Sequence, residues 1–309
     1  MKTIIHTIIF LALAVCSSCM RLDGFLYNPN ENPISEYLLD EYQGPVEFSL
    51  PDSMKIEKSM IHLFQIESND NGDLKKLWAL YLGDISRIDM DTIILYCHGN
   101  KDHLDFYYPR AQLLAWVGGR HHYGVMMFDY RGFGLSEGET TESGLYADTD
   151  AAMKWLKDRG LTDDRLVIYG FSMGTAPATE LTAHPMTLQP AKLILEAPFA
   201  SAEVFVQDGT GLAIPGSYIV NLEINNADEI QLVQQPFLWI HGTNDSFISM
   251  NSHGNVVFAN YNGNKGFACR VSGADHSDCP VFLGFDIYRN ILDKFIRNQL
   301  EYGPLIHEE

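Results

Sequence analysis

The feature that most constrains the fold is a regular alternation of short apolar runs with segments of helical periodicity. The runs are each about six to eight residues long, rich in Val, Ile, Leu and Phe, and cover 92–99, 123–130, 165–171, 192–198, 237–242 and 267–273. Runs that are apolar on both faces are typical of strands covered on both sides, as in a parallel sheet. The alternation therefore predicts βα units with right-handed crossovers, in a mostly parallel twisted sheet with helices on both faces.

The segments outside the apolar runs complete this picture. Helices are expected at 107–117, 145–160, 173–184, 251–261 and 283–300. Two earlier runs, 60–67 and 77–83, predict antiparallel strands that open the sheet. The segment 199–235 interrupts the alternation, and its apolar content favours a short cap over the site rather than a disordered loop.

A candidate nucleophile follows the third of the six apolar runs. Gly170-Phe171-Ser172-Met173-Gly174 fits the pattern G-x-S-x-G, a sharp turn from strand to helix that holds a serine in a strained conformation. Ligands of open α/β sheets bind beyond the carboxyl ends of the strands, and this pentapeptide lies at such an end. We therefore interpret Ser172 as a catalytic nucleophile.

A serine hydroxyl needs a base to take its proton, and the base needs an acid to orient it. Asp245 follows the apolar run 237–242, and His276 follows 267–273, so the order along the chain is serine, acid, histidine. Asp275 and Asp278 are alternatives for the acid, but they are too close to His276 in sequence to reach its far ring nitrogen well.

Other histidines and the oxyanion donors complete the candidate site. His98 and His241 occur in His-Gly pairs at strand ends, and we interpret them as structural. The developing charge on a substrate carbonyl needs donors already in place. The backbone N–H groups of Met173 and Asn100 are the candidates for this oxyanion hole.

The first nineteen residues differ from the rest of the chain. Lys2 precedes an apolar run from Ile4 to Val15, which is short for a membrane span and predicts a signal peptide. Cys19 follows Ser18 in a setting that resembles the lipobox of bacterial lipoproteins, so Cys19 is the favoured lipidation site and Cys16 is the alternative. An ordinary cleaved signal without lipid stays open. The expected location is a bacterial envelope membrane, or else the periplasm or the extracellular space.

The domain organisation follows from these segments. Residues 1–19 are the predicted signal peptide, 20–51 a tether and lead-in rich in Asn, Pro, Glu and Tyr, and 52–309 the catalytic domain with the cap at 199–235. Cys97 is expected to be a buried apolar residue. Cys269 and Cys279 could pair in an oxidising compartment, and an unpaired state is equally open.

Charge and motifs exclude several classes of protein. The formal net charge of −19 argues against nucleic acid as a partner, because phosphates would be repelled. No group of histidines and carboxylates has convincing zinc spacing, and no glycine loop has the lysine of a phosphate-binding loop. We therefore expect neither a metal nor a cofactor.

Five motifs together resemble the α/β-hydrolase superfamily: YCHGN, FDYRGFGLSEG, YGFSMG, HGTNDSFI and GADHSD, in that order. The set is similar to a branch of small serine hydrolases that includes membrane-linked lipid and acyl-protein hydrolases. The resemblance implies an α/β-hydrolase fold, cofactor-free hydrolysis through an acyl-enzyme on Ser172, and structural roles for Asp129 and Arg131. Met173 is bulkier than the residue of some relatives, and GADHSD differs in detail.

The leading interpretation is a serine hydrolase of acyl esters or thioesters whose substrate is a small molecule or a lipid. A serine peptidase or amidase would use the same three residues, and specificity would lie in the cap and the pocket. A non-catalytic binding lipoprotein on a hydrolase scaffold is the third possibility, against which the presence of Ser172, Asp245 and His276 argues.

Overall fold

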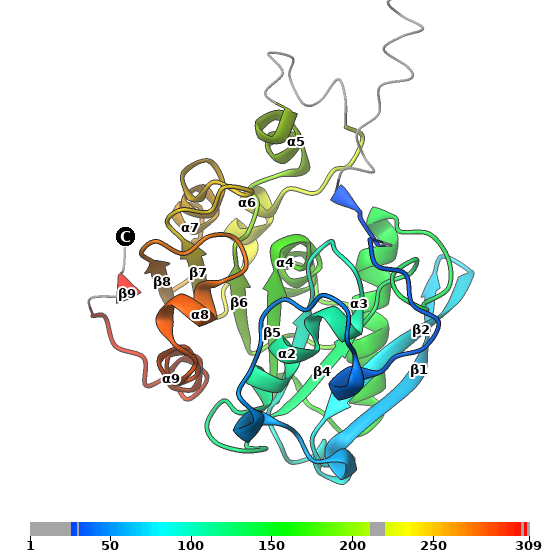
Figure 1. Ribbon diagram of the computed structural model, residues 1–309. Coiled ribbons are helices and arrows are strands. Elements are labelled where there is room, and N and C mark those ends of the chain that lie inside the picture. The colour runs from blue at the N-terminus through cyan, green and yellow to red at the C-terminus, as the bar shows by residue number, and fades with distance from the viewer. Residues whose placement is uncertain (1–25, 30, 211–219, 304–305, 308–309) are drawn as a thin grey trace, which may run out of the picture.

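A computed structural model describes residues 26–29, 31–210, 220–303 and 306–307, and shows one nine-stranded sheet between two layers of helices (Figure 1). The strand order is β1-β2-β4-β3-β5-β6-β7-β8-β9. Strands β3 to β8 are mutually parallel, whereas β1, β2 and β9 are antiparallel additions at the edges. The α/β-hydrolase fold that the resemblance implied, with its mostly parallel sheet, is confirmed.

The strands coincide closely with the apolar runs of the sequence. Their bounds are β1 Ile61–Asp70, β2 Asp73–Leu82, β3 Ile93–Cys97, β4 Gly124–Phe128, β5 Leu166–Phe171, β6 Lys192–Glu196, β7 Phe237–Gly242, β8 Gly266–Val271 and β9 Ile306–His307. All residues of β3, β4, β5, β6 and β7 are buried, as expected for strands covered on both faces. The two-residue strand β9 has no apolar run, and the sequence analysis missed it.

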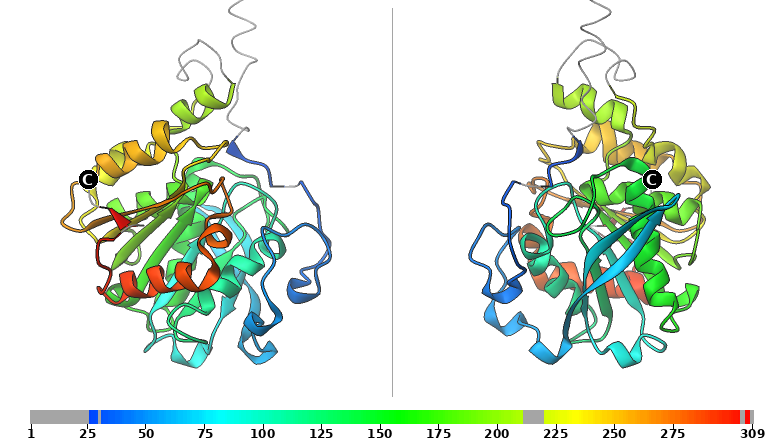
Figure 2. Two further views of the ribbon diagram at one scale, coloured as in Figure 1. Left: turned by 60° about the vertical axis from the view of Figure 1, so that its left-hand side comes forward. Right: turned by 90° about the vertical axis from the view of Figure 1, so that its right-hand side faces the viewer.

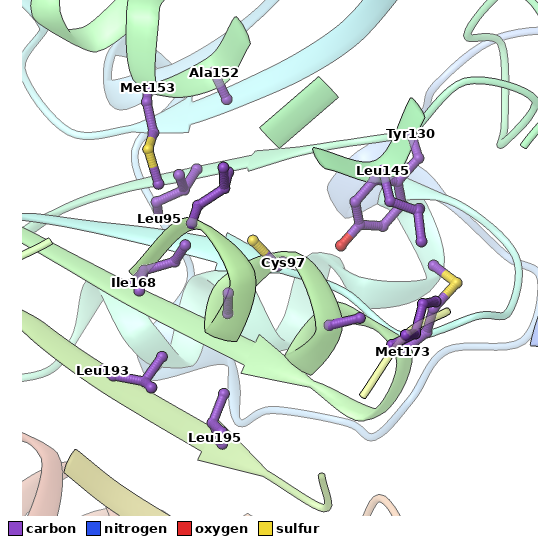
Figure 3. Packing of buried hydrophobic residues seen from close by; sticks show 14 of the residues in the cluster. Leu95, Cys97, Tyr130, Leu145, Ala152, Met153, Ile168, Met173, Leu193 and Leu195 are labelled. Carbon is purple, nitrogen blue, oxygen red and sulfur yellow. The ribbon is translucent and has the colours of Figure 1, made fainter. Parts of the chain in front are cut away.

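The helices cover the two faces of the sheet separately. Helices α2 (Leu104–Ala115), α8 (Cys279–Leu283) and α9 (Phe285–Ile296) pack on one face, and α3 (Glu142–Lys157), α4 (Thr175–Ala183) and α7 (Asn255–Ala259) pack on the other. Successive residues of a strand point to opposite faces. Leu95 and Cys97 accordingly join the core under α3 and α4, where Leu145, Met153 and the side chain of Met173 also pack (Figure 3).

The segment expected to form a cap contains helices α5 (Ala202–Thr210) and α6 (Asn226–Glu229) and the turn η9 (Ile230–Leu232). Helix α5 extends beyond the carboxyl ends of the strands, above the body of the domain (Figure 2). Its residues Phe205 and Val206 are buried against the core cluster that also contains Phe199. The part of the cap at 211–219 lies outside the described residues.

The segment expected to be a tether packs against the domain from Leu26 onward. Leu26 is 2% exposed and Phe48 is 8% exposed. The segment includes the turn η2 (Leu39–Glu41), and the turns η3 (Asp52–Met54) and η4 (Lys58–Met60) follow before β1. It runs beside α2 (blue in Figures 1 and 2). The described residues of the segment 26–51 therefore pack against the domain.

Three expectations concern the predicted signal peptide, the lipidation site and the cysteines of the domain. The predicted signal peptide, Cys16 and Cys19 lie outside the described residues. None of the helices in the described ranges is both long and apolar enough to cross a bilayer. Cys97, Cys269 and Cys279 are buried free thiols, so the possible Cys269–Cys279 pair is not formed in this structure.

Candidate active site

Ser172 lies in a strained backbone conformation between β5 and α4. Its φ is +53°, in the left-handed region that non-glycine residues rarely adopt, and it begins the single turn η7 (Ser172–Gly174). Both glycines of the pentapeptide are required by close packing. A Cβ on Gly170 would lie 2.5 Å from the carbonyl oxygen of Gly174, and one on Gly174 would lie 2.0 Å from that of Cys97.

The structure brings Ser172, His276 and Asp245 into one hydrogen-bonded row. His276 Nε2 lies 3.0 Å from Ser172 Oγ, and His276 Nδ1 lies 2.9 Å from Asp245 Oδ2. Asp245 follows β7 and His276 follows β8, so three loops at the carboxyl edge of the sheet supply the three side chains. These distances are those of a serine, a base that can take its proton, and an acid that orients the base.

Asp245 is held as a carboxylate by its surroundings. Its Oδ1 accepts hydrogen bonds from the backbone N–H groups of Phe247 and Ile248, and its Oδ2 lies 3.2 Å from His241 Nε2. Burial on its own would raise the pKa of Asp245, but the hydrogen bonds with His241 and His276 outweigh burial and lower the pKa below its usual range. Asp245 therefore stays ionised at neutral pH, opposite the His276 ring.

The alternative acids shape the histidine loop instead. Asp275 Oδ1 accepts from the backbone N–H groups of Ser246 and His276, and Asp278 Oδ1 accepts from the N–H of Asp275. These bonds join the loop after β7 to the loop after β8. His241 is fully buried beside Asp245, and its Nε2 lies 2.9 Å from the Ile248 carbonyl, in agreement with a structural role.

The two expected oxyanion donors lie on opposite sides of Ser172 in the chain and come from different loops. The side chain of Met173 is 1% exposed in the core under α3 and α4, so it does not shape the pocket, and only its backbone can face the substrate. Asn100 follows β3 and lines the same cavity as Ser172 and His276. The structure thus places Asn100 at the expected edge of the site.

A cavity of about 570 Å³ opens over Ser172 and His276. Its size is in the range of small-molecule sites. Much of the lining is aromatic, and Phe171 and Phe247 also contact the His276 ring, with centroid separations of 5.3 and 5.0 Å. The other lining residues are Tyr27, Asn28, Glu31, Glu47, Asn100, Lys101, Phe106, Tyr107 and Ser277.

Sequence reasoning missed a buried charge network next to the site. Arg110 on α2 is fully buried and donates to both Glu47 and Glu196. Its Nη2 also donates to the carbonyl of Ser277, at 3.2 Å, and its guanidinium lies 4.9 Å from the Phe171 ring. Arg110 therefore contacts the residues next to both His276 and Ser172. The only signal in the sequence was a charged residue inside an apolar helix.

One group of side chains in the described part of the chain has the spacing to hold a metal ion. Glu180, His184 and Glu229 offer ligand atoms within 4.8 Å of one another. His184 Nε2 lies 2.8 Å from Glu229 Oε2, an ion-pair geometry that joins α4 to α6 without any metal. The group is separate from the Ser172 site.

Comparisons with known proteins agree with the fold. Residues 89–233 match a family model described as serine aminopeptidase S33. Alpha/beta hydrolase domain-containing protein 17B from Homo sapiens is 31% identical over 218 residues, which are 67% of this chain and 67% of that protein. The chain belongs to the α/β-hydrolase family. A 17C relative from Mus musculus is 30% identical over 218 residues and is covered over 60% of its length.

Solved structures share the fold of this chain. An esterase from Pyrococcus furiosus superposes with a TM-score of 0.64 at 16% identity, over 88% of this chain and 98% of that one. The esterase domain of a Rhodothermus marinus protein superposes with a TM-score of 0.55 at 16% identity, over 77% of this chain and 98% of that one. At such low identity these neighbours show the fold alone.

Proposed function

We propose that this α/β hydrolase is a serine hydrolase that cleaves carboxylic acyl esters or thioesters through an acyl-enzyme on Ser172. The observation that carries the proposal is the row Asp245–His276–Ser172, with separations of 2.9 and 3.0 Å, beneath a cavity lined with aromatic side chains. The positive φ of Ser172 supports it, because strained backbone is concentrated at functional sites.

The geometry supports a two-step reaction. His276 Nε2 takes the proton of Ser172 Oγ as the oxygen attacks the acyl carbon, and Asp245 stabilises the imidazolium that forms. The N–H groups of Met173 and Asn100 would bind the oxyanion of the tetrahedral intermediate. His276 then gives its proton to the departing alcohol or thiol. Water, activated by the same histidine, hydrolyses the acyl-enzyme and regenerates Ser172.

The charges of the cavity favour an ester over the substrate of an aminopeptidase, the activity in the matched family's description. An aminopeptidase must bind a free ammonium group, for which an available carboxylate is the natural partner. The two carboxylates among the lining residues are already paired: Glu47 with Arg110, and Glu31 with Lys101 at 3.2 Å. The cavity therefore suits an uncharged acyl group better than an amino terminus.

Labelling with a fluorophosphonate tests the proposed nucleophile. We expect the wild-type protein to form one adduct, located on Ser172 by mass spectrometry, and Ser172→Ala to form none while it keeps the wild-type circular dichroism spectrum. The same wild-type preparation should hydrolyse p-nitrophenyl esters and should cleave the matching anilides far more slowly. A folded wild type without adduct and without turnover would favour a non-catalytic binding protein, and faster anilide cleavage would favour a peptidase or amidase.

We also propose that the enzyme is attached to a bacterial envelope membrane through lipidated Cys19, with Cys16 as the alternative. The support is the apolar run from Ile4 to Val15 followed by small residues. In a bacterial host, Cys19→Ala should move the protein from the membrane fraction to the soluble fraction, and Cys16→Ala should not. Retention of both variants in the membrane, or release of both, would contradict the assignment of Cys19.

A further inference from the structure

The loop 98–103 carries the expected oxyanion donor Asn100. Residues of the N-terminal segment, which contains none of the five sequence motifs, form hydrogen bonds with this loop. Asn28 donates its backbone N–H to the carbonyl of Asn100 at 2.9 Å. Asn32 donates both its backbone N–H and its side-chain amide to Asp102 Oδ1, each at 2.9 Å. His103 Nε2 lies 3.0 Å from the Asn32 carbonyl. Asn28 and Asn32 thus contact both flanks of the loop 98–103.

The side chain of His98 contacts the peptide group that joins Gly99 to Asn100. His98 is fully buried, and its Nδ1 lies 2.7 Å from the carbonyl oxygen of Gly99, to which it donates. The Gly99 carbonyl and the Asn100 N–H belong to one planar trans peptide and point in opposite directions. Holding the Gly99 oxygen therefore also sets the direction of the Asn100 N–H.

The second ring nitrogen of His98, Nε2, faces Asp129, which accepts a hydrogen bond from Tyr37 of the N-terminal segment. His98 Nε2 lies 3.2 Å from Asp129 Oδ1, an ion-pair distance without the angle of a hydrogen bond, and Tyr37 donates its hydroxyl to Asp129 Oδ2 at 2.6 Å. The Tyr37 oxygen in turn accepts the backbone N–H of Leu135 at 2.8 Å. Burial and the nearby charge of Asp129 raise the pKa of Tyr37, so its hydroxyl stays a donor.

A glycine in the turn beside this contact leaves room for it. Gly134 has a φ of +51°, and a Cβ there would lie 2.2 Å from Asp129 Oδ2 and 2.5 Å from the Tyr37 hydroxyl. No side chain fits at this position without displacing the Tyr37–Asp129 hydrogen bond. The second glycine of the sequence RGFG is thus explained by the contact between the N-terminal segment and Asp129.

We propose that Tyr37 is a positioning residue of the hydrolase: through Asp129 and His98 it holds the Gly99–Asn100 peptide with its N–H directed at the oxyanion. The inference rests on the proposed function, because it assigns Asn100 to the oxyanion hole. It gives the N-terminal segment, which the motifs do not include, a part in transition-state stabilisation. A donor displaced by about 1 Å costs on the order of 100-fold in rate, so even a small shift of this peptide is measurable.

The test compares Tyr37→Phe with Tyr42→Phe. Tyr42 is in the same segment and its ring packs on His103, but its hydroxyl has no hydrogen-bond partner among the described residues. We expect Tyr37→Phe to lower kcat by about 10-fold or more with little change in KM, and Tyr42→Phe to leave both near wild type. Gly134→Ala should reproduce the loss of kcat with the tyrosine intact.

An inhibitor pair separates oxyanion binding from general damage. A trifluoromethyl ketone forms a hemiketal oxyanion on the serine, whereas a methyl ether of the same chain length forms none. Tyr37→Phe should weaken the ketone by the same factor as kcat and leave the affinity of the ether unchanged. Equal weakening of both inhibitors, or equal behaviour of Tyr37→Phe and Tyr42→Phe, would overturn the positioning role.

Hydrogen exchange distinguishes failure of this inference from failure of the proposed function. Amides of residues 98–103 should exchange at least about 10-fold faster in Tyr37→Phe than in the wild type or in Tyr42→Phe. If the wild type hydrolyses no ester but this loop is loosened, the proposed function is wrong and the positioning contact stands. If the wild type is active and exchange of the loop is unchanged, the inference is wrong and the proposed function stands.

Discussion

Replacing His276 by alanine should lower kcat for a short acyl ester by on the order of 10⁴-fold to 10⁶-fold, because no other base in the described structure contacts Ser172 Oγ. Ser172→Ala should cost as much. The double variant should be no worse than either single variant, since the two side chains act as one unit and the residual activity comes from binding and the oxyanion hole. Steady-state kinetics on the wild type, the two single variants and the double variant measures these three losses of kcat.

His184→Ala is the matched control for the histidine. Its ring lies on the surface beside Glu229 and outside the cavity, so its kcat should stay near wild type. Multiplicative loss in the Ser172→Ala, His276→Ala double variant would mean that the two residues contribute independently, which would contradict the proposed proton transfer from Ser172 to His276. Unchanged kcat in His276→Ala would assign the base to another group.

Arg110→Met should be strongly destabilising, with an expected loss of about 3–5 kcal/mol in the free energy of unfolding. The guanidinium is buried with Glu47 and Glu196, and both carboxylates would be left without their cationic partner. Tyr169 and Tyr288 also donate to Glu196, but neutral donors do not balance a buried charge. Urea unfolding followed by fluorescence measures the change.

Two further variants separate charge from packing at Arg110. Adding Glu196→Gln to Arg110→Met should recover part of the lost stability, because one of the uncompensated charges is removed. Arg297→Met, which breaks an exposed pair with Asp293, should unfold close to wild type. If the double variant recovers nothing, the loss at Arg110 comes from packing rather than from unpaired carboxylates.

The candidate site was largely predictable because each of its three catalytic candidates comes directly after a strand in the sequence. Ser172 and His276 were each placed by a motif directly after an apolar run, and parallel strands bring such positions to one edge. Asp245 was separable from Asp275 and Asp278 on the ground of chain geometry, and the hydrogen bonds of all three agree with that choice.

The N-terminal layer was not predictable in the same way. Residues 26–51 have no periodic apolar pattern, so their composition indicated a tether. In the structure their polar side chains bind specific partners far along the chain: Asn32 binds Asp102, Tyr37 binds Asp129, and Glu47 binds Arg110. Single polar contacts of this kind have no period and no motif, which is why pattern analysis cannot detect them.

The order of strands and helices, the sharp turn at Ser172 and the succession of serine, acid and histidine could be read from local patterns, because periodicity and turn chemistry depend on neighbours in the chain. Only the tertiary structure decided which residues pair with Arg110 and with the two cavity carboxylates. It also decided which residues contact the loop of Asn100. Such contacts join residues up to 178 positions apart, as Arg110 and Tyr288 do. They form only when burial removes water and leaves each polar group to bind whichever partner the fold has brought within reach.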